Sequence, residues 1–148
     1  ENPSLIKEIA ETFGSQSVIV SIDVKEKMFG GYKVYTNGGK KATGLDPLTH
    51  AKNMEKMGAG ELMITSIKRE GTMNGYDLKL IQEIADAVTI PVIASGGAGT
   101  INHLVEAINK SHASAVAAGS MFVFYGKLKA VLINYPSKEE IKKVFFSD

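Results

Sequence analysis

The chain has 148 residues, 44% of them hydrophobic, which is enough apolar material for one domain with a buried core. Its 17 Lys and Arg residues balance 16 Asp and Glu residues, and no basic run is interleaved with aromatic residues, so we expect no nucleic-acid partner. The absence of cysteine excludes disulfides, thiolate metal sites and a cysteine nucleophile, and it favours a cytoplasmic protein. No apolar run reaches the roughly 18 residues of a membrane-spanning helix, so we expect no membrane association.

The first half of the chain predicts a helix, a strand, a hairpin and a second helix. Apolar residues at helical spacing predict a helix over 5–13. The β-branched run 17–24 predicts a strand buried on both faces, and Asp23 lies near its carboxyl end. Paired glycines around an alternating segment indicate a β-hairpin over 29–41, and a helix over 47–57 follows it.

The second half repeats a strand followed by a helix. We predict strands over 61–66, 91–95 and 114–118, helices over 77–87 and 101–109, a short apolar turn over 121–124, and a last helix that begins after Ser137. This alternation implies a parallel sheet with right-handed crossovers, either an open doubly wound sheet or a barrel. A complete barrel needs about 250 residues, so the barrel alternative requires further sequence or a partner half. The start at Glu1, without an initiator Met or a signal-peptide pattern, leads us to expect sequence before it.

Glycine-bearing loops follow two of the predicted strands, at 95–99 and 118–120. Glycines let backbone N–H groups approach an anion closely, and the amino end of a helix adds partial positive charge, so the two loops together can bind a phosphate without Lys. The alternative is that Gly96, Gly97 and Gly99 only make a tight turn between strand and helix. The loops do not form a dinucleotide-binding fingerprint, because the glycine spacing differs and no acidic residue follows at the expected distance.

Polar side chains at strand ends are the other candidates for chemistry. Asp23 is the best general acid or base, because carboxyl ends of strands face the catalytic rim of a barrel; a loop-capping Asp is the alternative. Thr65 and Ser66 could hydrogen-bond a substrate, although such residues often bond the backbone instead. No cofactor or metal is indicated, because ligand spacing and carboxylate partners are absent around His50, His103 and His112.

Several short blocks of the sequence resemble one enzyme family. The blocks are Glu1-Asn2-Pro3-Ser4-Leu5, Phe13-Gly14-Ser15-Gln16, Ser21-Ile22-Asp23, Gly58-Ala59-Gly60-Glu61, Thr65-Ser66-Ile67, Gly71-Thr72, Gly75-Tyr76-Asp77 and Ile93-Ala94-Ser95-Gly96-Gly97-Ala98-Gly99. In this order and at this spacing, they resemble the cyclase subunit of imidazole glycerol phosphate synthase over nearly the whole chain.

The resemblance implies a (β/α)8 TIM barrel made of two similar half-barrels, each with one phosphate site, and residues 1–148 would be the C-terminal half, with strands five to eight. The implied enzyme is a lyase of histidine biosynthesis that uses ammonia to cleave and cyclise a bisphosphorylated ribonucleotide precursor, releasing imidazole glycerol phosphate. Asp23 matches a catalytic Asp, Thr65 matches a polar substrate-contacting position, and Glu61 matches a charged residue of the gate for ammonia from a glutaminase partner. A strand-start carboxylate paired with Lys is the alternative for Glu61. The residues that match the second phosphate site of the family are Ser95, Gly96, Gly97, Gly119 and Ser120.

Two positions depart from the family pattern, which usually continues as Asp-Arg-Asp-Gly-Thr after Thr65-Ser66-Ile67. Here Lys68 replaces the first acid by a base, and Glu70 lengthens the second acid beside the expected substrate, so Glu70 joins the predicted substrate-binding residues. The change leaves open a paralogue that amidates a phosphorylated or nucleotide-linked sugar for surface polysaccharide. A third interpretation is a non-catalytic phosphate-binding half-barrel that folds alone or pairs with itself. Four strands leave two open edges and an exposed core face, which predicts dimers, aggregation or an N-terminal partner half.

Overall fold

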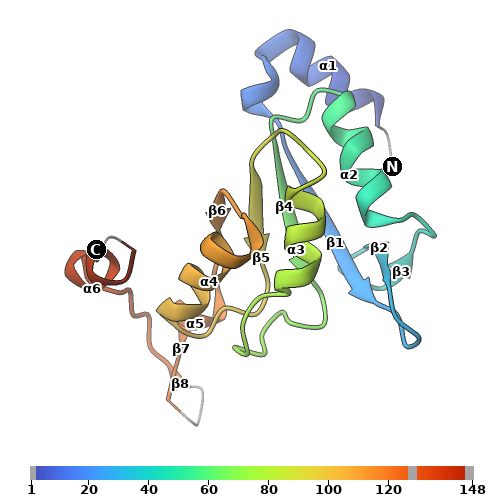
Figure 1. Ribbon diagram of the computed structural model, residues 1–148. Helices are drawn as coiled ribbons and strands as arrows, with labels where there is room; N and C mark the ends of the chain where they lie inside the picture. Colours follow the sequence, from blue (N-terminus) through green and yellow to red (C-terminus); the bar gives the residue numbers. More distant parts are fainter. Residues whose placement is uncertain (1–2, 127–129, 146–148) are drawn as a thin grey trace.

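Strands and helices alternate through most of the chain, as the sequence predicts (Figure 1). The computed structural model describes residues 3–126 and 130–145. The helices are α1 (Ser4–Phe13), α2 (Pro47–Lys56), α3 (Leu78–Ala85), α4 (Ile101–Ser111), α5 (Ser120–Val123) and α6 (Lys138–Phe145), with a 3-10 turn, η1, at Ser15–Ser17. The strands are β1 (Ile19–Glu26), β2 (Tyr32–Thr36), β3 (Lys41–Ala42), β4 (Glu61–Ser66), β5 (Val92–Ser95), β6 (Ala115–Val116), β7 (Phe124–Tyr125) and β8 (Ala130–Val131).

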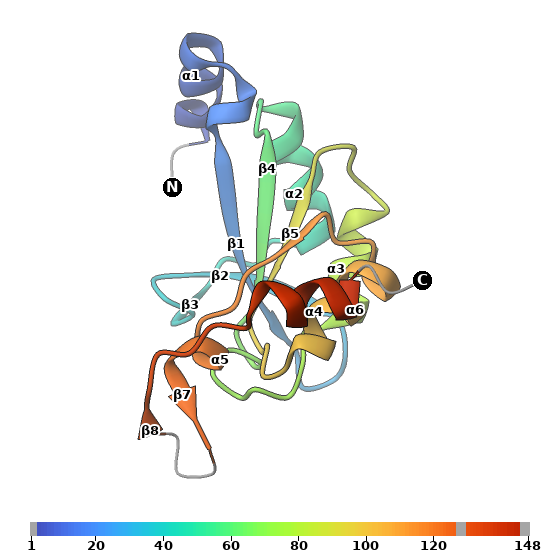
Figure 2. The same cartoon turned by 90° about the vertical axis from the view of Figure 1, so that its left-hand side faces the viewer.

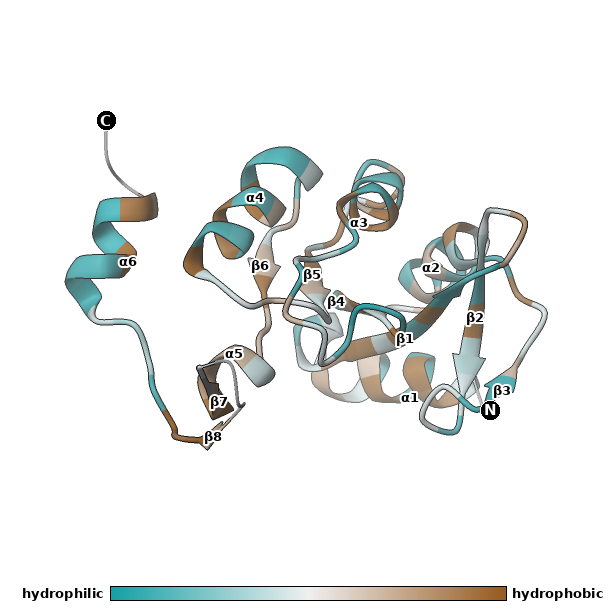
Figure 3. Cartoon of the chain, turned by 90° about the horizontal axis from the view of Figure 1, so that it is seen from below, coloured by the Kyte–Doolittle hydropathy of each residue, from teal (hydrophilic) through white to brown (hydrophobic). Residues whose placement is uncertain are grey.

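The central sheet is mixed, and its parallel strands follow one another in chain order. The order is β3-β2-β1-β4-β5-β6, in which β1, β4, β5 and β6 are parallel while β2 and β3 are antiparallel. Helices α2, α3 and α4 lie in a row on one side of these strands (Figure 3). An open doubly wound sheet reverses its strand order at a switch point and carries helices on both faces. The described strands do neither, so this part of the chain lacks the features of the doubly wound alternative.

Burial alternates along each parallel strand, so the two faces of the sheet differ. The residues that face α2, α3 and α4 are almost fully buried and form the core: Ile22, Val24, Leu62, Ile64, Val92 and Ala94. The residues between them, including Ser21 and Asp23, are exposed or half-buried, and Ile19 is 57% exposed. The prediction that the first strand is buried on both faces is therefore wrong for this chain by itself, because only one face is covered by helices.

Side-chain caps explain where two of the helices begin. Asp46 precedes α2 and accepts the backbone N–H of Thr49 at 2.8 Å, with Pro47 in the first turn, where a missing N–H costs nothing. Asp77 caps α3, and its Oδ1 also accepts the hydroxyl of Tyr32 at 3.0 Å. Burial, followed by the Asp77 carboxylate, raises the pKa of Tyr32 above its usual range. Asp77 therefore ties the start of α3 to the hairpin beside β1.

The strands predicted over 17–24 and 114–118 differ most in extent from the sequence prediction. β1 continues to Glu26 because its last four residues pair with β2, which places Asp23 inside the strand rather than close to its end. The predicted hairpin is present as β2 and β3, and it also covers part of the sheet edge expected to be open. The strand predicted over 114–118 is confirmed only at Ala115–Val116.

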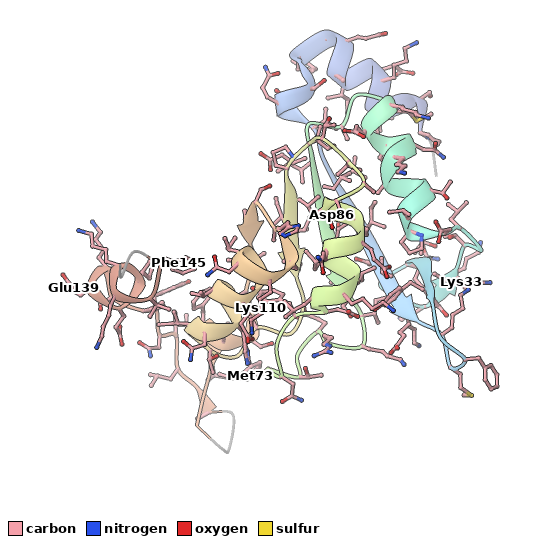
Figure 4. The ribbon with its side chains drawn as sticks, in the orientation of Figure 1. Lys33, Met73, Asp86, Lys110, Glu139 and Phe145 are labelled. Atoms are coloured by element: carbon pink, nitrogen blue, oxygen red, sulfur yellow. The ribbon has the colours of Figure 1, made fainter. Side chains whose placement is uncertain are left out.

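The last segment contains a ribbon that the sequence analysis did not predict. β7 and β8 are antiparallel, and the chain after them returns along α5, where the N–H of Leu132 donates to the carbonyl of Val123 at 3.0 Å. The predicted last helix is confirmed as α6, which follows reciprocal bonds between Ser137 and Glu140. α6 packs near α4 (Figure 2), and Phe145 points from it toward the core (Figure 4).

Candidate functional site

A pocket of about 370 Å³ opens where β4, β5 and β6 end. Its lining residues come from the ends of these strands and from the loops that follow them: Thr65, Glu70, Ser95, Gly96, Gly97, Ala98, Ala117, Ala118, Gly119 and Ser120. The structure thus brings together all seven residues predicted to contact substrate or phosphate. Carboxyl ends of parallel strands are where ligands bind in α/β proteins.

Asp23 lies in the same row of the sheet as two of the pocket residues. β1 and β4 pair Asp23 with Thr65, and β4 and β5 pair Thr65 with Ser95, so the three side chains share the face opposite the helices. Asp23 lines a second, more open pocket of about 360 Å³ with Ser21, Tyr35, Thr36 and Asn37. Thr65 therefore lies between the carboxylate of Asp23 and the glycine-bearing loop that follows Ser95.

Gly96 and Gly97 are required by the backbone and by their neighbours. Their φ angles are +88° and +108°, which side-chain-bearing residues rarely adopt. A Cβ at Gly96 would lie 2.9 Å from the carbonyl oxygen of Ser66, and one at Gly97 would overlap the carbonyl oxygen of Gly75. These glycines let the loop after β5 lie directly against the loop after β4.

The pocket offers backbone donors and one negative charge. Within the described residues, no acceptor takes the backbone N–H groups of Gly96, Gly97, Gly119 or Ser120. The lining residues that the structure describes include the carboxylate of Glu70 and neither Lys nor Arg. The backbone N–H groups would bind the anionic part of a ligand. The part of the ligand nearest Glu70 would need groups that donate hydrogen bonds to the Glu70 carboxylate.

The two departures from the family pattern lie in different surroundings. Lys68 does not line the pocket, and its Nζ lies 3.1 Å from Oε2 of Glu26 at the end of β1. Arg69 donates to the carbonyl oxygens of Asn74 and Gly75 at 3.4 Å, within its own loop. Of the two positions that depart from the family pattern, only Glu70 lines the pocket.

Tyr76 is a site-supporting residue that sequence reasoning missed. It is 3% exposed, and its hydroxyl donates to the carbonyl of Ala117 at 2.8 Å, which anchors the chain just after β6. Burial, with a smaller contribution from the negative charge of Glu70, raises the pKa of Tyr76 to about 12. The signal available in the sequence was its position between Gly75 and Asp77, in a block that resembles the family.

Ser66 and Glu61 occupy other positions on β4. Ser66 is 3% exposed and faces the helices, so the structure separates it from the pocket that Thr65 lines. Glu61 begins β4, on the same face as Thr65 but at the opposite end of the strand. The ion pairs found among the described residues do not involve Glu61, so pairing with Lys is not supported.

Histidines and acidic residues form no metal centre in the part of the chain that the structure describes. Burial lowers the pKa of His50. His112 lies on the surface, with Nδ1 2.6 Å from Oδ1 of Asp86. His103 differs from both, because it contacts the loop after β5: the N–H of Gly99 donates to its Nδ1 at 3.1 Å.

The fold and the pocket define an α/β protein with a pocket at the carboxyl ends of its parallel strands. Residues 1–129 match the family described as "Histidine biosynthesis protein", and the chain belongs to this family, whose members are TIM barrels. No helix among the described residues is long and apolar enough to cross a membrane.

A curated relative is similar to the chain more specifically than the family match is. The chain is 46% identical over 138 residues to a Pseudomonas aeruginosa protein named "Putative imidazole glycerol phosphate synthase subunit hisF2", and the match covers 93% of the chain and 55% of the relative. The predicted resemblance, to the cyclase subunit or its paralogue, is thereby confirmed. The chain spans about half the length of this curated relative.

Proposed function

We propose that this chain is the C-terminal half of a (β/α)8 barrel that, in the complete protein, uses ammonia to cleave and cyclise a bisphosphorylated ribonucleotide, releasing imidazole glycerol phosphate. The observation that carries the proposal is the convergence of the seven predicted residues on one pocket, in register with Asp23. Residues 1–148 would supply strands five to eight as part of a single domain.

The uncovered face of the sheet supports the half-barrel. Ile19, Met63 and Ile93 are apolar residues on the face opposite the helices, and Ile19 is 57% exposed. In a closed barrel, this face would become the packed interior, filled by layers of side chains from alternate strands. The relative's greater length leaves room for the strands that would close it. A stable, monodisperse monomer of residues 1–148 alone would count against this proposal.

Each group in the site has a role in the proposed reaction. Gly96, Gly97, Gly119 and Ser120 present their N–H groups to one phosphate, and Thr65 and Ser95 donate to or accept from the ribose side of the substrate. Asp23 moves protons during cleavage and ring closure as general base and general acid. Ammonia from a glutaminase partner would enter at Glu61 and pass along β4, where Glu61, Met63 and Thr65 share one face.

The paralogue that amidates a phosphorylated or nucleotide-linked sugar is the second candidate. Glu70 favours it, because this longer carboxylate lines the pocket where the family usually has Asp. A carboxylate at that place accepts hydrogen bonds from hydroxyl or amino groups and repels a closely placed second anion. Turnover of the ribonucleotide at an ordinary rate would exclude this candidate.

The direct test of the proposed chemistry is Asp23→Asn in the complete protein, assayed with ammonia as the nitrogen source. Asn keeps the size of Asp23 and loses its proton transfer, so kcat should fall on the order of 10²- to 10⁴-fold. Asp86→Asn is the matched control, because Asp86 pairs with His112 on the surface away from the pocket. Normal turnover by Asp23→Asn would overturn the assignment of Asp23.

A further inference from the structure

His103 lies in the first turn of α4, next to the loop after β5, and none of the proposed chemistry uses it. Its Nδ1 accepts the backbone N–H of Gly99 at 3.1 Å. A ring nitrogen that accepts a hydrogen bond carries no proton, so the neutral ring has its proton on Nε2. The contact therefore fixes both the tautomer of His103 and the direction of the Gly99 amide.

The other side of the same loop is held by the loop after β4. The N–H of Gly75 donates to the carbonyl of Gly97 at 2.8 Å. Added Cβ atoms at Gly97 and Gly99 would overlap the carbonyl oxygens of Gly75 and Met73. Met73 marks this supporting loop in Figure 4. The segment 96–99 is thus fixed between a rigid backbone surface and one imidazole nitrogen.

The backbone N–H groups of this loop differ in whether they have an acceptor, and this difference affects how a ligand could bind. Gly99 directs its N–H to His103, while the N–H groups of Gly96 and Gly97 have no acceptor among the described residues. Backbone donors bind an anion well only when their directions are fixed before it arrives, since ordering them on binding costs conformational entropy. Without an acceptor at His103, the Gly99 amide would lose the one hydrogen bond that it donates within the described residues, and the loop would lose a side-chain contact that supports it.

We propose that His103 is a positioning residue that orients the loop 96–99 for phosphate by accepting the Gly99 N–H at Nδ1. This inference rests on the proposed phosphate site and adds to it a residue that does not touch the ligand. The role depends on the position of one acceptor atom, so it predicts different behaviour for substitutions of similar size. Asn places an oxygen near the position of Nδ1, whereas Phe keeps the ring and removes the acceptor.

The test is isothermal titration of inorganic phosphate into the complete protein and its His103→Asn and His103→Phe variants. We expect His103→Phe to weaken phosphate binding about tenfold, because the loss of one hydrogen bond has about this effect. We expect His103→Asn, which keeps an acceptor, to stay within about threefold of the parent affinity. Equal affinity in the parent and His103→Phe would overturn the proposal. Equal losses of phosphate affinity in both variants would also overturn the proposal, because the acceptor that Asn keeps and Phe lacks would then make no difference.

Two further measurements separate this inference from the phosphate site itself. If the parent protein binds no phosphate, the proposed site fails, and His103 is then judged by the ¹⁵N signals of its ring and by hydrogen exchange of the Gly99 amide. A protonated Nδ1, or a Gly99 amide that exchanges as fast as an open loop, would overturn the inference independently. If His103→Phe does not fold, His103→Gln replaces it, because Gln carries its amide beyond the position of Nδ1.

Discussion

The pocket is lined by two glycine-bearing loops whose glycines have different physical roles. In the loop after β5, Gly96 and Gly97 have positive φ angles, and an added Cβ would meet backbone atoms. In the loop after β6, Gly119 has a φ of −115°, and a Cβ there would meet nothing within 4 Å. The first loop is constrained by close backbone contacts with the loop after β4, whereas the second is held by a hydrogen bond from the hydroxyl of Tyr76 to Ala117. Similar composition therefore does not imply similar constraint.

The largest difference between the loops should appear on replacing a glycine by alanine. Gly97→Ala forces a positive φ on a residue with a Cβ and creates an overlap with Gly75, so we expect a loss of about 3 kcal/mol in the free energy of unfolding. Gly119→Ala should cost under about 1 kcal/mol, since its φ is negative and a Cβ would meet no atom within 4 Å. Urea unfolding of the two variants measures both values. Similar losses would show that the loops are constrained alike.

Tyr76→Phe should disturb the second loop while leaving the first in place. The substitution removes the hydroxyl that bonds the carbonyl of Ala117 and leaves that carbonyl without this donor, for an expected loss of about 1–2 kcal/mol. Amide exchange should quicken at Ala117, whose N–H bonds the carbonyl of Ala94, and remain slow at Gly75, whose N–H bonds Gly97. Equal protection at Ala117 in both proteins would contradict the anchoring role.

The same tyrosine makes stability sensitive to alkaline pH. Burial raises the pKa of Tyr76 from 10.0 to about 12, so the folded state keeps the phenol proton more tightly than the unfolded state. The stabilisation from this difference is complete below pH 10, decreases as the pH rises from 10 to 12, and is lost above that range. Unfolding measured across this range should show a weaker pH dependence in Tyr76→Phe than in the parent protein.

The smallest expected effects separate the two departures from the family pattern. Lys68→Asp restores the usual acid, breaks the pair with Glu26 and places two carboxylates near each other. Both side chains are about half exposed to solvent, which screens these charges, so stability should change by less than about 1 kcal/mol. Glu70→Asp acts inside the pocket and should change KM for the ribonucleotide more than Lys68→Asp does. A larger change from Lys68→Asp would show that the charge at that position reaches the substrate.

Sequence reasoning predicts the elements of this fold better than the directions of individual side chains. β4 matches its predicted range, because its apolar residues and flanking glycines define it locally. The burial of Ser66 beside Thr65 depends on which face the helices cover, and only the assembled sheet determines that. β1 extends past Asp23 because it pairs with β2, which is a contact between separate segments.

The supporting residues were missed for a similar reason. Tyr76 bonds Ala117 across 41 positions of sequence, and no local pattern marks such a contact. His103 is only four residues from Gly99, but its role depends on the turn that brings Nδ1 to that amide. The pocket residues themselves were predictable, because glycines and hydroxyls after strands form recognisable groups and the family resemblance indicated which of them meet.

The central claim is that backbone donors of both loops bind one phosphate, and Gly119 allows the most direct test. Gly119→Asp adds a negative charge to open space in the pocket, and Gly119→Asn adds the same shape without the charge. Isothermal titration of the complete protein with inorganic phosphate should show saturable binding that Gly119→Asp weakens at least tenfold more than Gly119→Asn, because like charges repel at this distance. The same affinity in both variants, or no binding by the folded parent protein, would contradict the account.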